Sequence, residues 1–126
     1  MDVNDYKKLI SKTKKKSKHN NQKVDYDGIT FDSGKEKDYY VRLKLLERMG
    51  EVKYIEVHKR YDFYINDIYI GFYKLDFKVE YTDGVTEHID VKGIDKKTGK
   101  KVTSTSTFML KKKLMKAIHG IDVLIR

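Results

Sequence analysis

The chain contains neither cysteine nor proline. The lack of cysteine excludes disulfides, thiolate zinc sites and a cysteine nucleophile, and the lack of proline leaves glycine, asparagine and aspartate to mark the loops. No apolar run approaches the ~20 residues that a membrane-spanning helix needs, and the N-terminus lacks the continuous apolar core of a signal peptide. We therefore expect a cytoplasmic protein that has no membrane partner.

What the chain does have is a surplus of positive charge. Its 126 residues include 28 Lys and Arg against 19 Asp and Glu, which gives a net charge of +9 and a pI near 9.5. Such a surplus favours a polyanionic partner, and nucleic acid is the usual one. A hydrophobic content of 39% and an aromatic content of 12% are enough for one folded domain with a β component.

Residues 1–23 differ from the rest of the chain. From residue 7 to residue 23 there are eight lysines and no acid, with hardly any apolar side chains. Such a segment buries too little surface to offset the entropy of ordering, so we predict a flexible basic tail before a domain over 24–126. The tail either lies along phosphates, which would make binding salt-sensitive, or only keeps the protein soluble. The lysines expected to contact DNA there are Lys14, Lys15 and Lys16.

The first helix is expected over residues 34–49, after a short strand–turn–strand over 24–31. Ser33 and Glu36 form a capping box, in which the hydroxyl accepts from the amide of residue 36 and the carboxylate reaches back. Gly50 ends the helix. The stripe expected to be buried has helical spacing and consists of Tyr39, Tyr40, Leu43, Leu46 and Met49.

The remaining pattern predicts a mixed α/β (α+β) domain in which a helix is followed by about three antiparallel strands, a second helix and a strand. Strands are expected at 52–57, 60–65, 68–81, 85–92 and 121–125, and the second helix at 108–119. The apolar face of that helix is expected to hold Leu110, Leu114, Ala117 and Ile118. Its flanks either contact phosphate or form a solvated face, and they carry Lys111, Lys112, Lys113 and Lys116.

The alternation of the strands over 68–81 and 85–92 predicts the register of a hairpin. One face is apolar and includes Tyr73, Leu75, Phe77, Val79 and Tyr81; the other includes Lys74, Asp76, Lys78 and Glu80. Matching the apolar faces pairs Phe77 with Ile89 and leaves a three-residue loop that ends at Gly84. A two-residue turn would place Asp76 beside Val91 and mix the faces, so the pattern selects the first register.

That register places Asp76 opposite Asp90, with β-carbons about 5 Å apart. Carboxylates so placed repel each other unless a cation intervenes, and Mg²⁺ is commonly held by one or two carboxylates. Lys92 lies on the same face and would orient a water or stabilise a phosphoryl oxygen. Lys74 is expected opposite Lys92, where like-charge repulsion would lower the pKa of Lys92. His88 projects on this face too, and we interpret it as an exposed strand histidine rather than a proton acceptor.

These residues resemble the signature of the PD-(D/E)XK nuclease superfamily, in which an acid on one strand is followed by an acid-x-Lys element on the next. Asp76 matches the first acid, Asp90-Val91-Lys92 matches the second element, and Glu36 matches an additional acid from the first helix. Two positions depart from the pattern, because Leu75 stands where proline is common and Asp90 where glutamate is frequent. The segments that resemble a small phage-encoded family of uncharacterised function within this superfamily are Gly28–Glu36, Leu43–Gly50, Leu75–Phe77, Asp90–Gly93 and Lys111–Leu114.

The resemblance implies a restriction-endonuclease-like core and a DNA endonuclease that depends on Mg²⁺ or Mn²⁺. Glu36, Asp76 and Asp90 would hold the metal, with the Val91 carbonyl as a further ligand, and Lys92 would position the attacking water. The tail, together with Lys111 and Lys112, would contact the DNA backbone. The arrangement is also similar to that of phage Holliday-junction resolvases, which implies branched DNA as the substrate, a homodimer and the host-cell cytoplasm. The alternative is a nuclease fold that binds nucleic acid or inhibits a host complex without cleavage, and an RNA-binding module ranks last.

Overall fold

The computed structural model of the chain describes residues 22–93 and 105–126. The predicted basic tail lies outside the described residues except for its last two positions, and so do Lys14, Lys15 and Lys16 and most of the loop before the second helix. The chain divides into two compact units, Met1–Lys37 and Asp38–Arg126, and each is described by itself. Neither of the two helices in the described part is long and apolar enough to cross a membrane.

The first unit contains the predicted strand–turn–strand. β1 (Val24–Tyr26) pairs with β2 (Ile29–Phe31) in antiparallel fashion. Asp27 and Gly28 between them both have positive φ, which is the conformation that a tight two-residue hairpin turn requires. α2 (Gly34–Arg48) begins in this unit, and the Glu36 N–H donates to Ser33 Oγ at 3.2 Å. This bond confirms the hydroxyl half of the predicted capping box.

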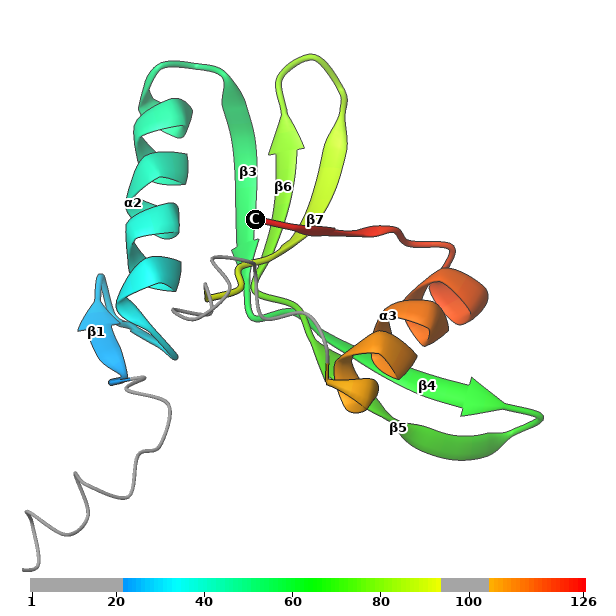
Figure 1. Cartoon of the computed structure of the whole chain (residues 1–126). Coiled ribbons are helices and arrows are strands. Elements are labelled where there is room, and N and C mark those ends of the chain that lie inside the picture. The colour runs from blue at the N-terminus through cyan, green and yellow to red at the C-terminus, as the bar shows by residue number, and fades with distance from the viewer. Residues whose placement is uncertain (1–21, 94–104) are drawn as a thin grey trace, which may run out of the picture. The chain divides into compact units, whose positions relative to one another are not determined.

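A four-stranded sheet is the centre of the second unit (Figure 1). Its order is β3 (Val52–Val57), β6 (Phe77–Tyr81), β7 (Thr86–Asp90) and β8 (Val123–Ile125). The first three strands are antiparallel, and β8 joins β7 in parallel after α3 (Ser106–His119). The fold is therefore mixed α+β. The predicted order of helix, three antiparallel strands, helix and strand is confirmed for α2, the central sheet and α3, with two further strands, β4 and β5, between β3 and β6.

A two-stranded hairpin stands between β3 and β6 in the chain. β4 (Arg60–Ile65) and β5 (Ile68–Lys74) pair around Asn66 and Asp67, both of which have positive φ. α3 lies along this hairpin (Figure 1). The hairpin face that packs against α3, its inner face, forms an apolar core together with α3. This core contains Tyr61, Phe63, Tyr73, Leu75, Phe108, Met115 and Val123.

The prediction of one continuous strand over 68–81 is wrong, because the chain bends at Leu75 and Asp76. The Leu75 N–H donates to the Lys59 carbonyl at 2.8 Å, and the His58 N–H donates to the Asp76 carbonyl at 3.1 Å. The alternation of apolar residues runs through the bend unbroken because Leu75 is buried in the hairpin core and Phe77 in the core of the other sheet. The Phe77 ring stacks on two rings of α2. Its centroid lies 5.6 Å from that of Tyr39 and 6.4 Å from that of Tyr40.

The β6–β7 register is the predicted one. Phe77 pairs with Ile89, and the Tyr81 N–H donates to the Val85 carbonyl at 2.8 Å across the three-residue loop. Gly84 has φ +94 in that loop, which only glycine adopts without strain. The ladder ends at the pair Phe77 and Ile89. Asp76 therefore precedes the first residue of β6, and Asp76 and Asp90 are not a ladder pair.

The buried face of α3 differs from the predicted one. Phe108 and Met115 are buried and Leu114 and Ile118 are partly buried, whereas Leu110 is 57% exposed and Ala117 is exposed. Both faces have helical spacing, and the inner face of the hairpin selects between them because it offers a surface on one side only. Met49, expected at the end of the α2 stripe, is exposed as well, because it follows the last helical residue.

This assignment of the α3 face predicts unequal effects of two substitutions. Met115→Ala, at a fully buried position, should lower the free energy of unfolding by about 2–5 kcal/mol because it leaves a cavity. Leu110→Ala should change it by no more than about 0.5 kcal/mol. Urea unfolding followed by circular dichroism measures both, and equal losses would contradict the packing of α3 described above.

Candidate active site

The predicted acids meet where β5 turns into β6 and where β7 ends. Asp76 is half-buried, and its Oδ2 accepts a hydrogen bond from the Val91 N–H at 2.8 Å. Val91 is the middle residue of the acid-x-Lys triplet that begins at Asp90. The predicted position of Asp76 within a strand is therefore wrong, because Asp76 lies in the bend between β5 and β6. Its carboxylate still contacts the triplet, through the hydrogen bond from the Val91 N–H.

Asp90 has an ordered and almost fully buried carboxylate. It is 6% exposed, and its Oδ2 accepts from the Tyr73 hydroxyl in a short hydrogen bond and lies 3.2 Å from Lys92 Nζ. Both contacts use Oδ2. The backbone is held as well, because the Arg126 N–H donates to the Asp90 carbonyl at 3.0 Å. The protein thus holds Asp90 through one carboxylate oxygen and through its backbone carbonyl.

Lys92 is held between the acid and an aromatic ring. Its Nζ lies 3.2 Å from Asp90 Oδ2 and 3.9 Å from the centroid of the Phe108 ring. A ring face attracts an ammonium electrostatically, so the first turn of α3 fixes the position of the Lys92 side chain. The side chain is 24% exposed, which leaves the ammonium accessible to a small ligand or a water.

Tyr73 is a site residue that the sequence did not reveal. Burial raises the pKa of its hydroxyl above the usual value of 10, and the charges of Asp90 and Asp76 raise it further. The hydroxyl therefore stays protonated and remains a donor to Asp90 at neutral pH. The alternation of the sequence placed Tyr73 on the same apolar face as Phe77. The bend directs the Tyr73 hydroxyl to Asp90 instead, and nothing in the sequence indicated this contact.

His58 is a second residue that the sequence did not single out. It has φ +58, an uncommon backbone conformation for a residue other than glycine, and a ring nitrogen within 4.8 Å of a carboxylate oxygen of Asp76. The turn between β3 and β4 places it there. Nothing in the local sequence distinguishes it from a solvated loop histidine.

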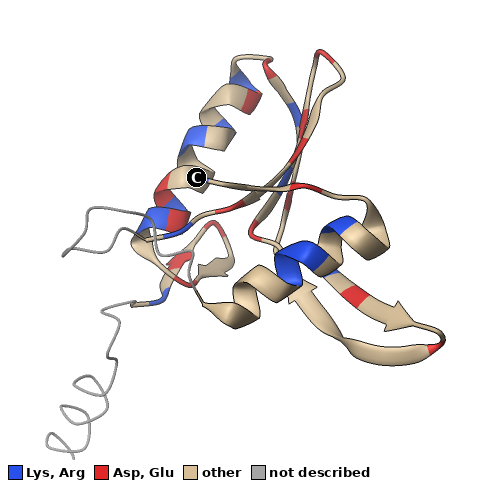
Figure 2. Cartoon of the chain, turned by 45° about the vertical axis from the view of Figure 1, so that its right-hand side comes forward, with Lys and Arg blue, Asp and Glu red and all other residues tan. Residues whose placement is uncertain are grey.

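The structure places the other predicted site residues as follows. Lys74 pairs with Arg60 in the hairpin and does not face Lys92, so the expected like-charge repulsion loses its basis. Glu36 lies in the first turn of α2 and is buried, and its role as a metal ligand stays a prediction. The same holds for the Val91 carbonyl. Lys111 and Lys112 lie on the basic stretch of α3 (Figure 2), and their contact with DNA stays a prediction too.

The donors at this site are of the kind that Mg²⁺ and Mn²⁺ prefer. Both cations favour carboxylate oxygens over nitrogen or sulfur ligands. Asp76 and Asp90 supply carboxylates, and Asp76 accepts from the amide of the residue that follows Asp90. Asp90 is almost fully buried, and Tyr73 and Lys92 contact its Oδ2 atom. The donor types therefore suit a divalent cation, and the cation itself stays a prediction.

Comparison with known proteins identifies the family of the chain. The family model described as "Protein of unknown function (DUF1064)" matches residues 16–121, so the chain belongs to this family. No curated protein and no solved structure matches the chain. The family carries no assigned activity, and a function has to be argued from the site itself.

His88 lies beside the site and is half-buried, not exposed as expected, with its ring centroid 6.4 Å from that of Tyr61. Burial lowers the pKa of His88 below 6.5, and the charges of Lys78 and Lys59 lower it further.

The lowered pKa of His88 predicts a pH effect on stability. The unfolded state binds the proton more readily than the folded state, so the contribution of His88 is present above about pH 6.5 and is lost as the pH falls towards the lower folded value. Relative to His88→Gln, the wild-type protein should therefore lose stability between pH 7.5 and pH 5. Urea unfolding at both pH values measures this, and parallel pH profiles for the two proteins would contradict it.

Proposed function

We propose that this member of the family is a divalent-metal-dependent endodeoxyribonuclease that hydrolyses phosphodiester bonds. The observation that carries the proposal is the hydrogen bond from the Val91 N–H to Asp76 Oδ2, because it joins the first acid to the middle of the Asp90-Val91-Lys92 triplet. The order of helix, three antiparallel strands, helix and strand that α2, the central sheet and α3 follow, apart from the inserted β4–β5 hairpin, supports the resemblance to PD-(D/E)XK nucleases. The net charge of +9 supports DNA as the partner.

In this proposal the side chains have separate tasks. Asp76 and Asp90 bind the cation, which would polarise the scissile phosphate and lower the pKa of a water. Lys92 donates hydrogen bonds that orient the water and stabilise negative charge on a phosphoryl oxygen. The Tyr73 hydroxyl and Lys92 hold Asp90 Oδ2, so that Oδ1 keeps one direction and the site needs little rearrangement when the cation binds.

The proposed substrate is branched or junction-like DNA. This choice rests on the similarity to phage Holliday-junction resolvases and is an argument by analogy. Two symmetric cuts at a junction require two active sites, so the proposal includes a homodimer that acts in the cytoplasm of the host cell. Lys111 and Lys112 on α3 would contact the DNA backbone, together with the basic tail.

A second candidate function is nucleic-acid binding or host inhibition without cleavage. One observation favours it: Asp90 Oδ2 already has two protein partners, Tyr73 and Lys92. A buried acid with two such partners is also what a structural ion pair looks like. The two candidates differ in whether metal binds and whether DNA is cut, and the following experiments separate them.

Cleavage should require the metal and the triplet. With linear, nicked and four-way-junction DNA in Mg²⁺ or Mn²⁺, the wild-type protein should cut at least one substrate, and EDTA should abolish cutting. Lys92→Met should lower the rate about 100- to 10,000-fold because general acid–base and charge stabilisation are lost, and Asp76→Ala should reduce it to background. Cleavage products are measured on denaturing gels.

A matched control for this assay is Asp122→Asn, which removes an exposed acid whose partner is Lys116 and should cut like the wild type. If no substrate is cut with either metal, or if Asp76→Ala cuts at the wild-type rate, the nuclease assignment is wrong.

Metal binding should stabilise the fold through Asp90. At a free Mn²⁺ concentration 100 times the dissociation constant, the free energy of unfolding should rise by about 2.7 kcal/mol. Asp90→Asn should lose most of this increment and Asp122→Asn should keep it. The comparison uses the metal-dependent increment and not absolute stability, because Asp90→Asn also changes the bonds to Tyr73 and Lys92. An equal increment in Asp90→Asn would favour the non-catalytic candidate.

A further inference from the structure

The β4–β5 hairpin has one buried face and one exposed face. The inner face packs against α3, as described above. The exposed face, which we call the outer face, consists of Arg60, Asp62, Tyr64, Tyr69, Phe72 and Lys74. Its three aromatic rings are 57%, 46% and 40% exposed and belong to Tyr64, Tyr69 and Phe72. Figure 2 shows that most of the hairpin carries no charge, and on the outer face three exposed rings lie among three charged side chains.

Cations are fixed against the rings of the outer face. The Arg60 guanidinium lies 4.1 Å from the centroid of the Phe72 ring, and Lys111 Nζ, from α3, lies 5.1 Å from it. Tyr69 and Asp62 hold Arg60 through contacts of 3.1 Å each. A guanidinium layered on an aromatic ring presents a flat cationic surface, on which a nucleobase stacks well.

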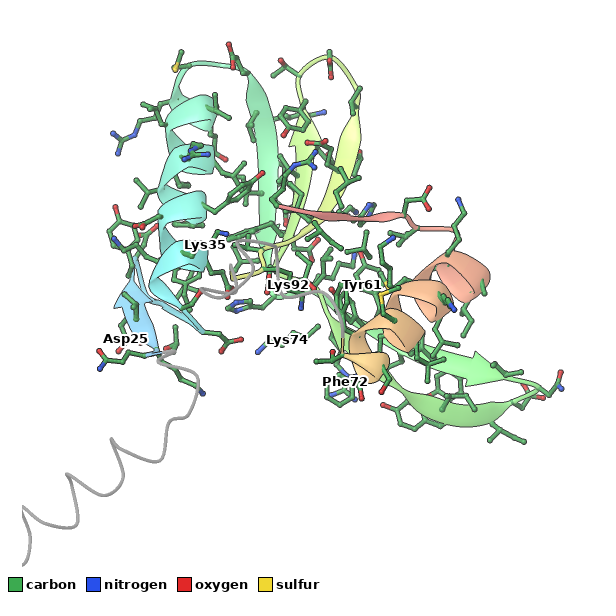
Figure 3. All side chains as sticks on the ribbon, viewed as in Figure 1. Asp25, Lys35, Tyr61, Phe72, Lys74 and Lys92 are labelled. Atoms are coloured by element: carbon green, nitrogen blue, oxygen red, sulfur yellow. The ribbon has the colours of Figure 1, made fainter. Side chains whose placement is uncertain are left out.

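The outer face leads to the candidate active site. Phe72 and Lys74 occupy alternate positions on β5, which ends directly before the bend at Asp76. Between them, Tyr73 points to the other face and donates to Asp90. In the view of Figure 3, Phe72, Lys74 and Lys92 follow one another from the hairpin towards the site.

We propose that the outer face of the β4–β5 hairpin binds unpaired nucleotides of single-stranded or branched DNA. Exposed aromatic rings beside fixed cations are the means by which proteins hold single strands, since each base offers a flat face and each nucleotide a phosphate. The proposal deepens the proposed function and rests on DNA as its partner. It explains how a hairpin with an exposed apolar face would serve a nuclease for branched substrates, which contain unpaired nucleotides near the cut.

A second copy of the chain is the other occupant to consider for an apolar patch. The local charge argues against a second copy at this face, because the cations that lie against the Phe72 ring would repel the same cations of the other copy, whereas they attract DNA. These cations are Arg60, on the outer face, and Lys111, on α3. Lys111 and Arg60 would face their own counterparts across a symmetric contact between two copies.

The test measures binding without cleavage. The full-length protein is titrated into a fluorescent thymidine oligonucleotide of about 20 nucleotides in EDTA, and affinity is read from anisotropy, with a blunt duplex of equal length for comparison. Phe72→Leu and Tyr69→Leu each remove an aromatic ring and keep an apolar side chain, and Tyr69→Leu also removes the hydroxyl that contacts Arg60. Each should weaken single-strand binding about 5- to 100-fold. Tyr54→Leu, at an exposed tyrosine on β3, is the matched control and should bind like the wild type.

Salt separates stacking from charge. Phe72→Leu should leave the slope of log affinity against log salt unchanged, whereas Lys111→Gln should make that slope shallower by about 0.7, the value for one phosphate contact on a single strand. A merely structural role of Phe72 would not produce this contrast. Melting curves of each variant confirm that the fold is retained.

Three outcomes would overturn the proposal: wild-type affinity in Phe72→Leu and Tyr69→Leu, an equal loss in Tyr54→Leu, or a change in oligomeric state on size exclusion without a change in DNA affinity. The last outcome would assign the outer face to a second copy. Because binding is measured in EDTA, a protein that binds as expected but never cuts DNA would retain this proposal and lose the nuclease assignment.

Discussion

The bend at Leu75 and Asp76 is the constraint on which the rest of the second unit depends. Two backbone hydrogen bonds hold it, from Leu75 to Lys59 and from His58 to Asp76. They tie the start of β4 to the end of β5, so the hairpin leaves the four-stranded sheet and returns to it at one point. Because the backbone bends at Asp76, the Asp76 side chain does not follow the alternating directions of a strand, and its carboxylate accepts a hydrogen bond from the Val91 N–H.

The burial of Asp90 is the second condition, and it explains why so many contacts converge there. A buried carboxylate is costly unless it is paired and hydrogen-bonded. Tyr73 and Lys92 meet that need, and Phe108 holds Lys92 from the other side. Among the described residues, no buried side-chain nitrogen or oxygen lacks a hydrogen-bond partner. The geometry that stabilises the acid is also the geometry that would orient it towards a cation.

The hairpin depends on α3 in the same way. A two-stranded sheet is marginal in water by itself, and Phe108 and Met115 supply the apolar surface that covers its inner face. Nothing comparable covers the outer face among the described residues, where Tyr64, Tyr69 and Phe72 remain exposed. The hairpin between β3 and β6 thus holds three of the five exposed aromatic side chains of the described residues.

The sequence by itself determined the α+β class, the two helices and the register that pairs Phe77 with Ile89. It did so because helical and strand periods, turn residues and apolar faces are local properties that a short window contains. Only the tertiary structure decided that Tyr73 points to Asp90, that Met115 is buried in place of Leu110, and that Lys74 leaves the site. A bend that keeps the alternation intact is invisible in the pattern, and a helix with two apolar stripes of equal spacing buries whichever one meets a partner surface.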